Sequence, residues 1–166
     1  TMTLANQAIP ILSVQNATSS SPIFTVLYNG RVGIGTSSPT LGPLTMDSGA
    51  HVTGGGTWTN ASSRDLKENF TPLDSETVLE KINSLFISRW NYKKESASTT
   101  HIGPVAEDFY DAFGTGGDNG RASISSIDPA GVALLGIQGL SKKVDRLSSL
   151  VASVGGGIVD GVNGFK

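Results

Sequence analysis

A serine and a lysine that could form a catalytic pair stand close together near the middle of the chain. Ser62 precedes Lys67 by five residues, within the segment 60–69. A serine hydroxyl is a weak nucleophile at neutral pH, and a lysine amine can serve as its base only when the amine is unprotonated. Lowering the pKa of a lysine from about 10.4 to about 7–8 takes roughly 4 kcal/mol, supplied by burial or by nearby positive charge. The two residue types therefore suit acyl transfer at a peptide bond.

The spacing of the pair decides how the chain must fold around it. Five residues place two side chains about 140° apart on a helix and on opposite faces of a strand. Ser62 and Lys67 can therefore meet only if the segment bends or if two subunits approach each other. Among the neighbours, Arg64 favours a neutral amine, whereas Asp65 and Glu68 oppose it. We expect these two acids to point elsewhere or to pair with Arg64.

The residues around the pair resemble a known processing site, with the order Ser-Ser-Arg-Asp-Leu-Lys-Glu-Asn from Ser62 onward and Gly-Thr-Trp-Thr-Asn-Ala before it. This order is similar to the junction of the intramolecular chaperone auto-processing domains at the C-termini of phage endosialidase tailspikes and tail fibres. Members of that family usually read Ser-Asp-x-Arg-x-Lys, so the outer serine and lysine match while Ser63 and Asp65 depart from the pattern. The resemblance implies self-cleavage between Ala61 and Ser62, with Ser62 as nucleophile and Lys67 as general base.

The implied reaction is a single turnover within the chain. Ser62 attacks the Ala61 carbonyl and gives an ester that water hydrolyses, so effective molarity replaces substrate binding. Backbone N–H groups are the default oxyanion donors. The candidate supporting residues are Arg64, Glu68, Asn69 and His101.

Two alternatives remain open for these residues. His101 could orient the pair or accept a proton, but a structural hydrogen bond is the favoured role for it. For the pair itself, the alternative is that Ser62 caps a turn and that Lys67 is solvated.

Composition excludes several classes of function. The chain has 166 residues, a net charge of −2, no cysteine and two histidines, so nothing indicates a nucleic-acid partner, a membrane surface, a disulfide framework, a metal site or a cofactor. No apolar run approaches a membrane span, and no signal-peptide layout is present. The start at Thr1 indicates a piece of a longer polypeptide. Gly33-Ile34-Gly35 lacks the third glycine of a dinucleotide loop, and the sequons at Asn16 and Asn60 are interpreted as coincidence.

Residues 1–61 carry short apolar runs separated by turn residues, as β-strands do. The runs are 9–14, 24–28 and 31–35, and Asn29-Gly30 predicts a tight hairpin turn. They are too poor in aliphatic mass to build a core alone, so neighbouring repeats or chains must stabilise them. Residues 28–39 resemble the Asn-Gly-x-Val-Gly-Ile-Gly-Thr-x-x-Pro phrase of phage tail fibres, which implies the distal end of an intertwined trimeric β-shaft. Glycine-rich residues 54–59 would be a flexible lead into the cleavage site.

From residue 62 onward the pattern is mixed α and β. A helix is predicted to begin with Asp74 or Ser75 as N-cap, and its apolar stripe comprises Val78, Leu79, Ile82 and Leu85. Residues 86–92 alternate as in a strand. The segment from 101 to 109 resembles the family's His-Ile-Gly-x-Ile-Ala phrase, a strand end followed by a helix that stops at Gly114. Residues 116–120 predict a loop, and 122–127 a short strand.

The last long pattern is a heptad seam on a helix that Asp128-Pro129 opens. Its members step by four and three, with the a positions β-branched: Ala133, Ile137, Leu140, Val144, Leu147, Val151 and Val154. Taken alone this choice favours a parallel dimer, but the resemblance implies a trimer. The alternative is a helix packed on its own domain. Gly136 and Gly139 would allow close packing against the body, and Gly155-Gly156-Gly157 would end the helix.

The sequence thus predicts an α+β chain with two parts. Residues 1–61 would be the distal end of a β-structured tail-fibre shaft, and residues 62–166 a mixed α/β chaperone with a trimeric coiled-coil helix at about 129–154. The predicted function is an intramolecular chaperone that forms a homotrimer, folds the upstream shaft of the same polypeptide and releases itself by self-cleavage. The fibre would belong to a virion and assemble in the bacterial host cytoplasm. The alternatives are a trimerisation domain that never cleaves and a receptor- or glycan-binding fibre tip.

Overall fold

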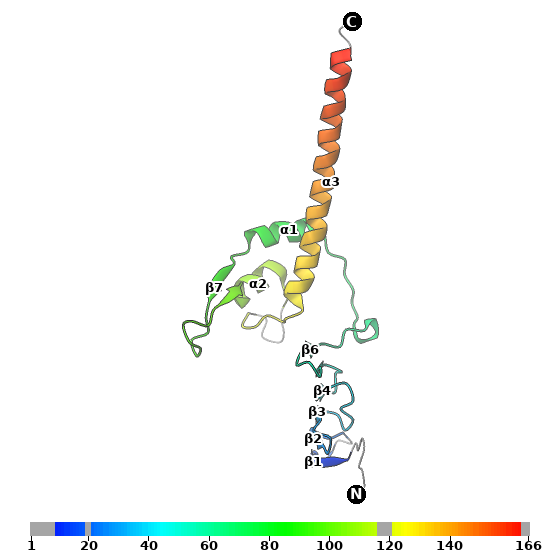
Figure 1. Ribbon diagram of the computed structural model, residues 1–166, viewed down its shortest axis with the longest axis vertical. Helices are drawn as coiled ribbons and strands as arrows, with labels where there is room; N and C mark the ends of the chain where they lie inside the picture. The colour runs from blue at the N-terminus through cyan, green and yellow to red at the C-terminus, as the bar shows by residue number, and fades with distance from the viewer. Residues whose placement is uncertain (1–8, 19–20, 116–120, 164–166) are drawn as a thin grey trace. The chain divides into compact units, whose positions relative to one another are not determined.

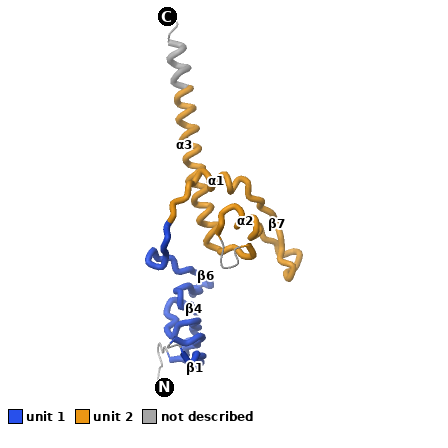
Figure 2. Tube along the Cα trace, turned by 180° about the vertical axis from the view of Figure 1, so that it is seen from behind, with its two compact units in different colours: residues 1–70 blue, residues 71–166 orange. Residues whose placement is uncertain are grey.

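The structure is a computed structural model that describes residues 9–18, 21–115 and 121–163. It is α+β: the strands of one sheet come first, and helices follow them together with a second, two-stranded sheet (Figure 1). Internal contacts divide the chain into two compact units, Thr1–Phe70 and Thr71–Lys166 (Figure 2). The fold therefore has the predicted class, and the division by contacts falls a few residues after the pair Ser62 and Lys67.

The first unit is a six-stranded sheet in which each strand pairs with the next along the chain. The pairs are antiparallel except for β3 with β4, which run parallel. The strands are short and have these bounds: β1 Pro10–Val14, β2 Phe24–Leu27, β3 Val32–Ile34, β4 Leu44–Met46, β5 His51–Val52 and β6 Trp58–Thr59.

The turn between β2 and β3 is the hairpin that Asn29-Gly30 predicts. Gly30 has φ 82° and donates its backbone N–H to Leu27 O at 2.9 Å, while Leu27 N donates to Arg31 O. Glycine adopts this left-handed conformation without steric cost. The prediction of a hairpin here is confirmed.

The prediction of a flexible lead at residues 54–59 is wrong. Thr53 N donates to Thr57 O and Gly56 N donates to Thr53 O, which closes a second hairpin between β5 and β6. Gly56 has φ 82°, so the glycines here serve a tight turn. The segment that leads to the candidate cleavage site is therefore part of the sheet.

The first unit has little core of its own. Its buried apolar side chains are Leu27 and two prolines, Pro22 and Pro39, and the hydroxyl residues Thr25 and Thr45 are buried as well. All of β1 is exposed, with Ile11 at 64% and Leu12 at 51%. Large apolar side chains left in water are a liability for a monomer, so this sheet has surface available for further burial.

The second unit combines three helices with one small sheet. Its elements are α1 Ser75–Ser84, β7 Ser88–Trp90, β8 His101–Gly103, α2 Ala106–Phe113 and α3 Asp128–Asn163, with β7 and β8 antiparallel. Asp74 is the N-cap of α1, because its carboxylate accepts the Thr77 backbone N–H at 2.8 Å. Gly114 ends α2 in the left-handed region at φ 67°. Both helix boundaries were predicted.

Two predictions about this unit fail. Residues 121–127 form turns and irregular backbone, so the strand predicted at 122–127 does not exist, and the loop predicted at 116–120 lies outside the described residues. The helix α3 does not end at Gly155 but continues to Asn163. Glycine costs a helix about 1 kcal/mol per residue. Three glycines in a row weaken α3 without terminating it.

Helix α1 packs directly against α3. A Cβ added to Gly139 would lie 2.3 Å from the Ser75 carbonyl oxygen, and one added to Gly136 would lie 2.5 Å from Ile82 Cδ1. The predicted close packing at these two glycines is therefore confirmed. Two ion pairs flank it, one from Arg146 to Glu76 and a longer one from Lys143 to Glu80.

A neighbouring face of α3 carries the predicted seam and is left uncovered in the single chain. Ile137 is 64% exposed and Leu140 54%, and the other large members are equally open: Val144, Leu147, Val151 and Val154. The alternative, that α3 packs on its own unit, holds for the face that carries Gly136 and Gly139, which contacts α1. These two positions lie outside the seam. The seam therefore remains available to other chains.

Candidate functional site

The bend that the pair requires is a single turn of 3₁₀ helix, η1, at Arg64–Leu66. Ser63 caps this turn, because its hydroxyl accepts the Asp65 backbone N–H at 3.3 Å. Leu66 N donates to Ser63 O and Lys67 N to Arg64 O, at 3.2 and 3.1 Å. A 3₁₀ turn has three residues per turn. It folds the chain back so that the residues just before and just after it approach each other.

Ser62 and Lys67 meet at the two ends of this turn. Lys67 Nζ lies 2.6 Å from Ser62 Oγ and forms a hydrogen bond with it. Both side chains belong to one chain, so the contact needs no second subunit. The cap of the turn is Ser63, which leaves the Ser62 hydroxyl to the lysine amine.

Arg64 does not pair with the acids beside it. Its guanidinium lies over the Phe70 ring, 4.6 Å from the centroid, as a cation–π contact. In the described part of the chain, no ion pair involves Asp65, Glu68 or Lys67. The expected pairing of these acids with Arg64 is therefore not formed.

The loop that holds the pair closes on itself. Asn69 has φ 56°, a left-handed conformation that a non-glycine residue adopts rarely and asparagine more readily than most. This turn brings Phe70 back over Arg64. The cap at Ser63, the η1 turn and the Arg64–Phe70 contact all lie within residues 62–70, so local interactions help to set the position of the pair.

His101 has the structural hydrogen bond that was the favoured reading. Its Nε2 lies 3.0 Å from Glu95 Oε2. The centroid of its ring lies 4.9 Å from that of Trp90, in a tilted arrangement, and 5.4 Å from that of Tyr92, which it meets edge-on. It belongs to the second unit, where Trp90 of β7 faces it across the small sheet. These contacts fix the loop between β7 and β8.

The environment of the pair decides what it can do. Ser62 and Lys67 are both exposed in the single chain. A lysine amine acts as a base only when neutral, and removal from water favours the neutral form. The arrangement therefore has the geometry for proton transfer from hydroxyl to amine, and it needs desolvation to act.

The residue before the bond is held differently from those after it. Ala61 is half-buried, whereas residues 62–70 are exposed. Trp58 Nε1 donates to Asn60 Oδ1 at 2.9 Å. The sequence analysis predicted neither the hydrogen bond between Trp58 and Asn60 nor the capping role of Ser63. The Ser-x-x sequence before a short turn could have indicated the cap, but no local signal links an indole to an amide two residues away.

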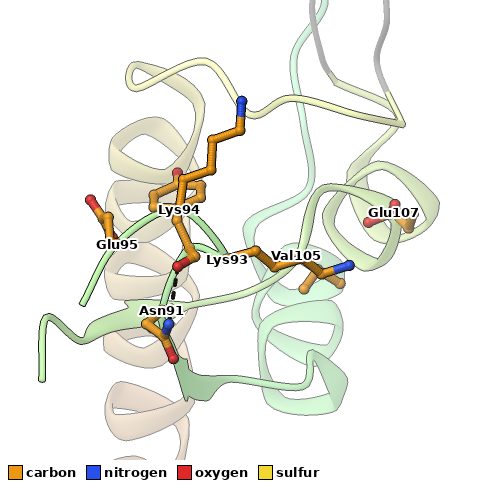
Figure 3. Close-up of a pocket in the computed structure, with 7 residues that line it drawn as sticks. Asn91, Lys93, Lys94, Glu95, Val105 and Glu107 are labelled. Carbon is orange, nitrogen blue, oxygen red and sulfur yellow. Dashed lines mark hydrogen bonds between the residues drawn. The ribbon is translucent and has the colours of Figure 1, made fainter. Parts of the chain in front are cut away.

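The second unit contains an open hollow that has no catalytic character. It measures about 850 Å³ and lies between the β7–β8 loop and the start of α2 (Figure 3). Its lining includes Lys93, Lys94, Glu95, Val105 and Glu107. The one hydrogen bond drawn there, from Asn91 Nδ2 to Tyr92 O at 3.0 Å, ties adjacent residues together.

Among residues 9–18, 21–115 and 121–163, no three side chains of the His, Cys, Asp and Glu types come together as a metal site would require. Within the same residues, no helix has the length and apolar character needed to span a membrane.

Comparison with known proteins finds one family model that matches part of the chain. Residues 62–118 match the family model described as chaperone of endosialidase, a family named as a peptidase. The match begins at Ser62, contains Lys67 and runs through α1, the small sheet and α2, ending before α3. No curated protein and no solved structure matches the chain.

Proposed function

Because residues 62–118 are an endosialidase-type intramolecular chaperone domain, we propose that this chain folds and trimerises the end of a phage tail fibre and then cuts itself off between Ala61 and Ser62. Ser62 is the nucleophile and Lys67 the general base. The observation that carries the proposal is the 2.6 Å contact between Ser62 Oγ and Lys67 Nζ at the first residues of the family match.

The reaction follows from the positions of these atoms. The neutral Lys67 amine takes the proton of the Ser62 hydroxyl as Oγ attacks the Ala61 carbonyl carbon. The proton then passes to the amide nitrogen of Ser62, the C–N bond breaks, and an ester joins Ala61 to Oγ. Water hydrolyses that ester, which leaves a carboxylate on Ala61 and restores the Ser62 hydroxyl. No co-reactant beyond water is required.

Proximity supplies much of the rate. The nucleophile is attached to the residue next to the carbonyl it attacks, so no substrate has to bind. The base is held by the η1 turn on the same chain. An enzyme of this design acts once on itself.

Assembly provides the switch in this account. The pair is exposed in one chain, and the amine becomes an effective base when subunits bury it. The uncovered seam of α3 supports assembly, since six of its large apolar side chains face water in the single chain. A trimeric coiled coil along these positions would bury them and align three chains in parallel.

The partner of the chaperone would be the upstream sheet of the same polypeptide. The first unit buries few apolar side chains and leaves β1 open, so it gains stability from copies of itself. Pairing between strands of different chains is slow because the contacts are non-local, and a trimeric template would set their register. Removing the template afterwards leaves the fibre kinetically trapped. The product would be part of a phage tail.

The test compares self-cleavage of the full chain with that of two variants. On a denaturing gel, the wild-type protein should separate into two pieces, whereas Ser62→Ala and Lys67→Ala should stay at the full-length 17.2 kDa. Ser126→Ala and Lys94→Ala are matched controls, because each removes an exposed serine or lysine elsewhere. Both controls should cleave as the wild type does. Light scattering of all five proteins measures their oligomeric state. It distinguishes a variant that assembles but does not cleave from a variant that does not assemble.

A trimerisation domain that stays attached is the second candidate, and the uncovered seam would serve it equally well. It predicts one intact band for the wild-type protein after prolonged incubation as a folded trimer. A receptor- or glycan-binding tip is the third reading, tested by glycan binding of the isolated first fragment.

A further inference from the structure

The two sides of the candidate bond are held by different means. The side after the bond lies in an exposed loop that begins at Ser62. The side before it continues from β6, where Trp58 pairs with Val52 and Thr59 with His51 of β5. The carbonyl under attack is therefore carried by the sheet, while the nucleophile is carried by the loop.

The side chain of Ala61 rests against a turn between β4 and β5. A Cβ added to Gly49, in that turn, would lie 3.3 Å from Ala61 Cβ. Gly49 has φ 85° and donates its N–H to Met46 O at 3.0 Å. His51 Nδ1 lies 3.0 Å from Gly49 O, so the turn is fixed on both sides.

The residue between β6 and the bond is also tied down. Asn60 Oδ1 accepts the Trp58 indole N–H at 2.9 Å, which restricts the chain just before Ala61. A strand, a side-chain hydrogen bond and a contact with a turn thus act on three consecutive positions. Together they limit the rotations that would move the Ala61 carbonyl.

We propose that the Gly49 turn is the subsite for the residue before the scissile bond, and that Gly49 and Ala61 together restrict that position to small side chains. This inference rests on the proposed self-cleavage and names the part of the chain that positions its substrate. The substrate recognised is a peptide segment of the chain itself, entering along β6 with a small residue at position 61.

The angle at which Ser62 Oγ approaches the Ala61 carbonyl limits the rate of cleavage. Ser62 Oγ can reach the preceding carbonyl only over a narrow range of backbone angles, and displacement by about 1 Å can cost roughly a hundredfold in rate. A second methyl group, on Gly49, would lie 3.3 Å from that of Ala61, which is tighter than an ordinary van der Waals contact. A second methyl group would push residue 61 off the turn and turn its carbonyl away.

The chain offers a matched control for this contact. Gly49 and Gly56 have nearly the same left-handed backbone, with φ 85° and 82°, so alanine is strained to a similar extent at both. Only the first has a side chain beside it, since a Cβ at Gly56 would meet nothing within 4 Å. The difference between Gly49→Ala and Gly56→Ala therefore reports the contact with Ala61.

The experiment measures the rate of self-cleavage of the full chain, with oligomeric state checked for each variant. Gly49→Ala should slow cleavage roughly tenfold or more relative to Gly56→Ala. The double variant Gly49→Ala with Ala61→Gly moves the methyl group to the other side of the contact, and it should recover most of the cleavage rate that Gly49→Ala loses. Ala61→Leu, which leaves the turn intact, should slow cleavage as well.

The results for the Gly49 and Ala61 variants test the subsite, and the result for the wild-type protein tests the proposed self-cleavage. Equal rates for Gly49→Ala and Gly56→Ala, no rescue by the double variant, or normal cleavage of Ala61→Leu would overturn the subsite. Wild-type protein that assembles without cleaving would overturn the proposed function and this inference together. Should Gly49→Ala fail to fold, Ala61→Leu still decides the question.

Discussion

Gly139 on α3 lies against the backbone carbonyl of Ser75 on α1, so closely that a Cβ at Gly139 would stand 2.3 Å from that oxygen. The neighbour is backbone at the first residue of α1, which cannot rotate out of the way. The contact joins the helix that carries the seam to the part of the chain that matches the chaperone family. It therefore sets the position of the chaperone body along the helix that would assemble.

Alanine at this position should separate the two helices. Overpacking of a close contact costs typically about 1–3 kcal/mol, so Gly139→Ala should lower the thermal unfolding midpoint. Gly131→Ala is the control in the same helix, because a Cβ there meets nothing within 4 Å. That control should be neutral or stabilising, since alanine favours helix over glycine by about 1 kcal/mol. Equal effects of the two variants would show that α1 does not pack at Gly139.

The cap of the η1 turn should affect the rate of self-cleavage. Ser63→Ala removes the acceptor for the Asp65 N–H and loosens the turn that joins Ser62 to Lys67. An N-cap contributes about 1 kcal/mol, so the cleavage rate should fall about fivefold. Ser63→Asp, which keeps an acceptor at the cap, should restore the rate. Failure of that rescue would mean that Ser63 acts other than through the turn.

The seam should control both assembly and cleavage. A double change, Val144→Asp with Leu147→Asp, places charges on the uncovered stripe and should abolish the trimer. Cleavage should be lost with it, because the amine would stay in water. Ser149→Asp adds a charge to the same helix outside the seam and serves as the control. Full cleavage by a monomer, measured by light scattering and gel, would contradict the assembly switch.

The cap of α1 should give a pH dependence of stability. Hydrogen bonds from the Thr77 backbone N–H and hydroxyl lower the pKa of Asp74 below its usual value of 3.8. A lowered pKa in the folded state means that the carboxylate stabilises the fold fully above its usual pKa of 3.8, and that this contribution disappears as pH falls through the folded pKa. Thermal unfolding of Asp74→Ala should therefore differ from wild type at neutral pH and converge with it in acid. A difference that is constant across that range would contradict the ionised cap.

Local signals in the sequence accounted for the parts of the fold that local forces decide. Asn29-Gly30 specified a hairpin because few residues adopt the left-handed turn, and Asp74 and Gly114 marked helix ends for similar reasons. The seam could be predicted because its apolar residues recur at steps of four and three, which is the spacing of one face of a helix. The five-residue spacing of Ser62 and Lys67 also predicted a bend, which the η1 turn supplies.

Other features depended on contacts that spacing does not encode. The parallel pairing of β3 with β4 joins segments separated by an irregular loop, and β5 and β6 are too short to show alternation. Residues 122–127 have strand-like residue types but no partner strand among the described residues. The cap fell to Ser63 although Ser62 carries the same side chain, because the turn begins one residue later. The helix α3 continues across three glycines although each costs about 1 kcal/mol, because glycine weakens a helix without preventing the next residue from continuing it.

The central claim is that the chain breaks itself between Ala61 and Ser62, and the most direct measurement is mass spectrometry with N-terminal sequencing of the assembled wild-type protein. The account predicts two pieces, one ending with the carboxylate of Ala61 and one beginning with the free amine of Ser62. A trimer made of intact chains, or a new N-terminus at any other residue, would contradict it.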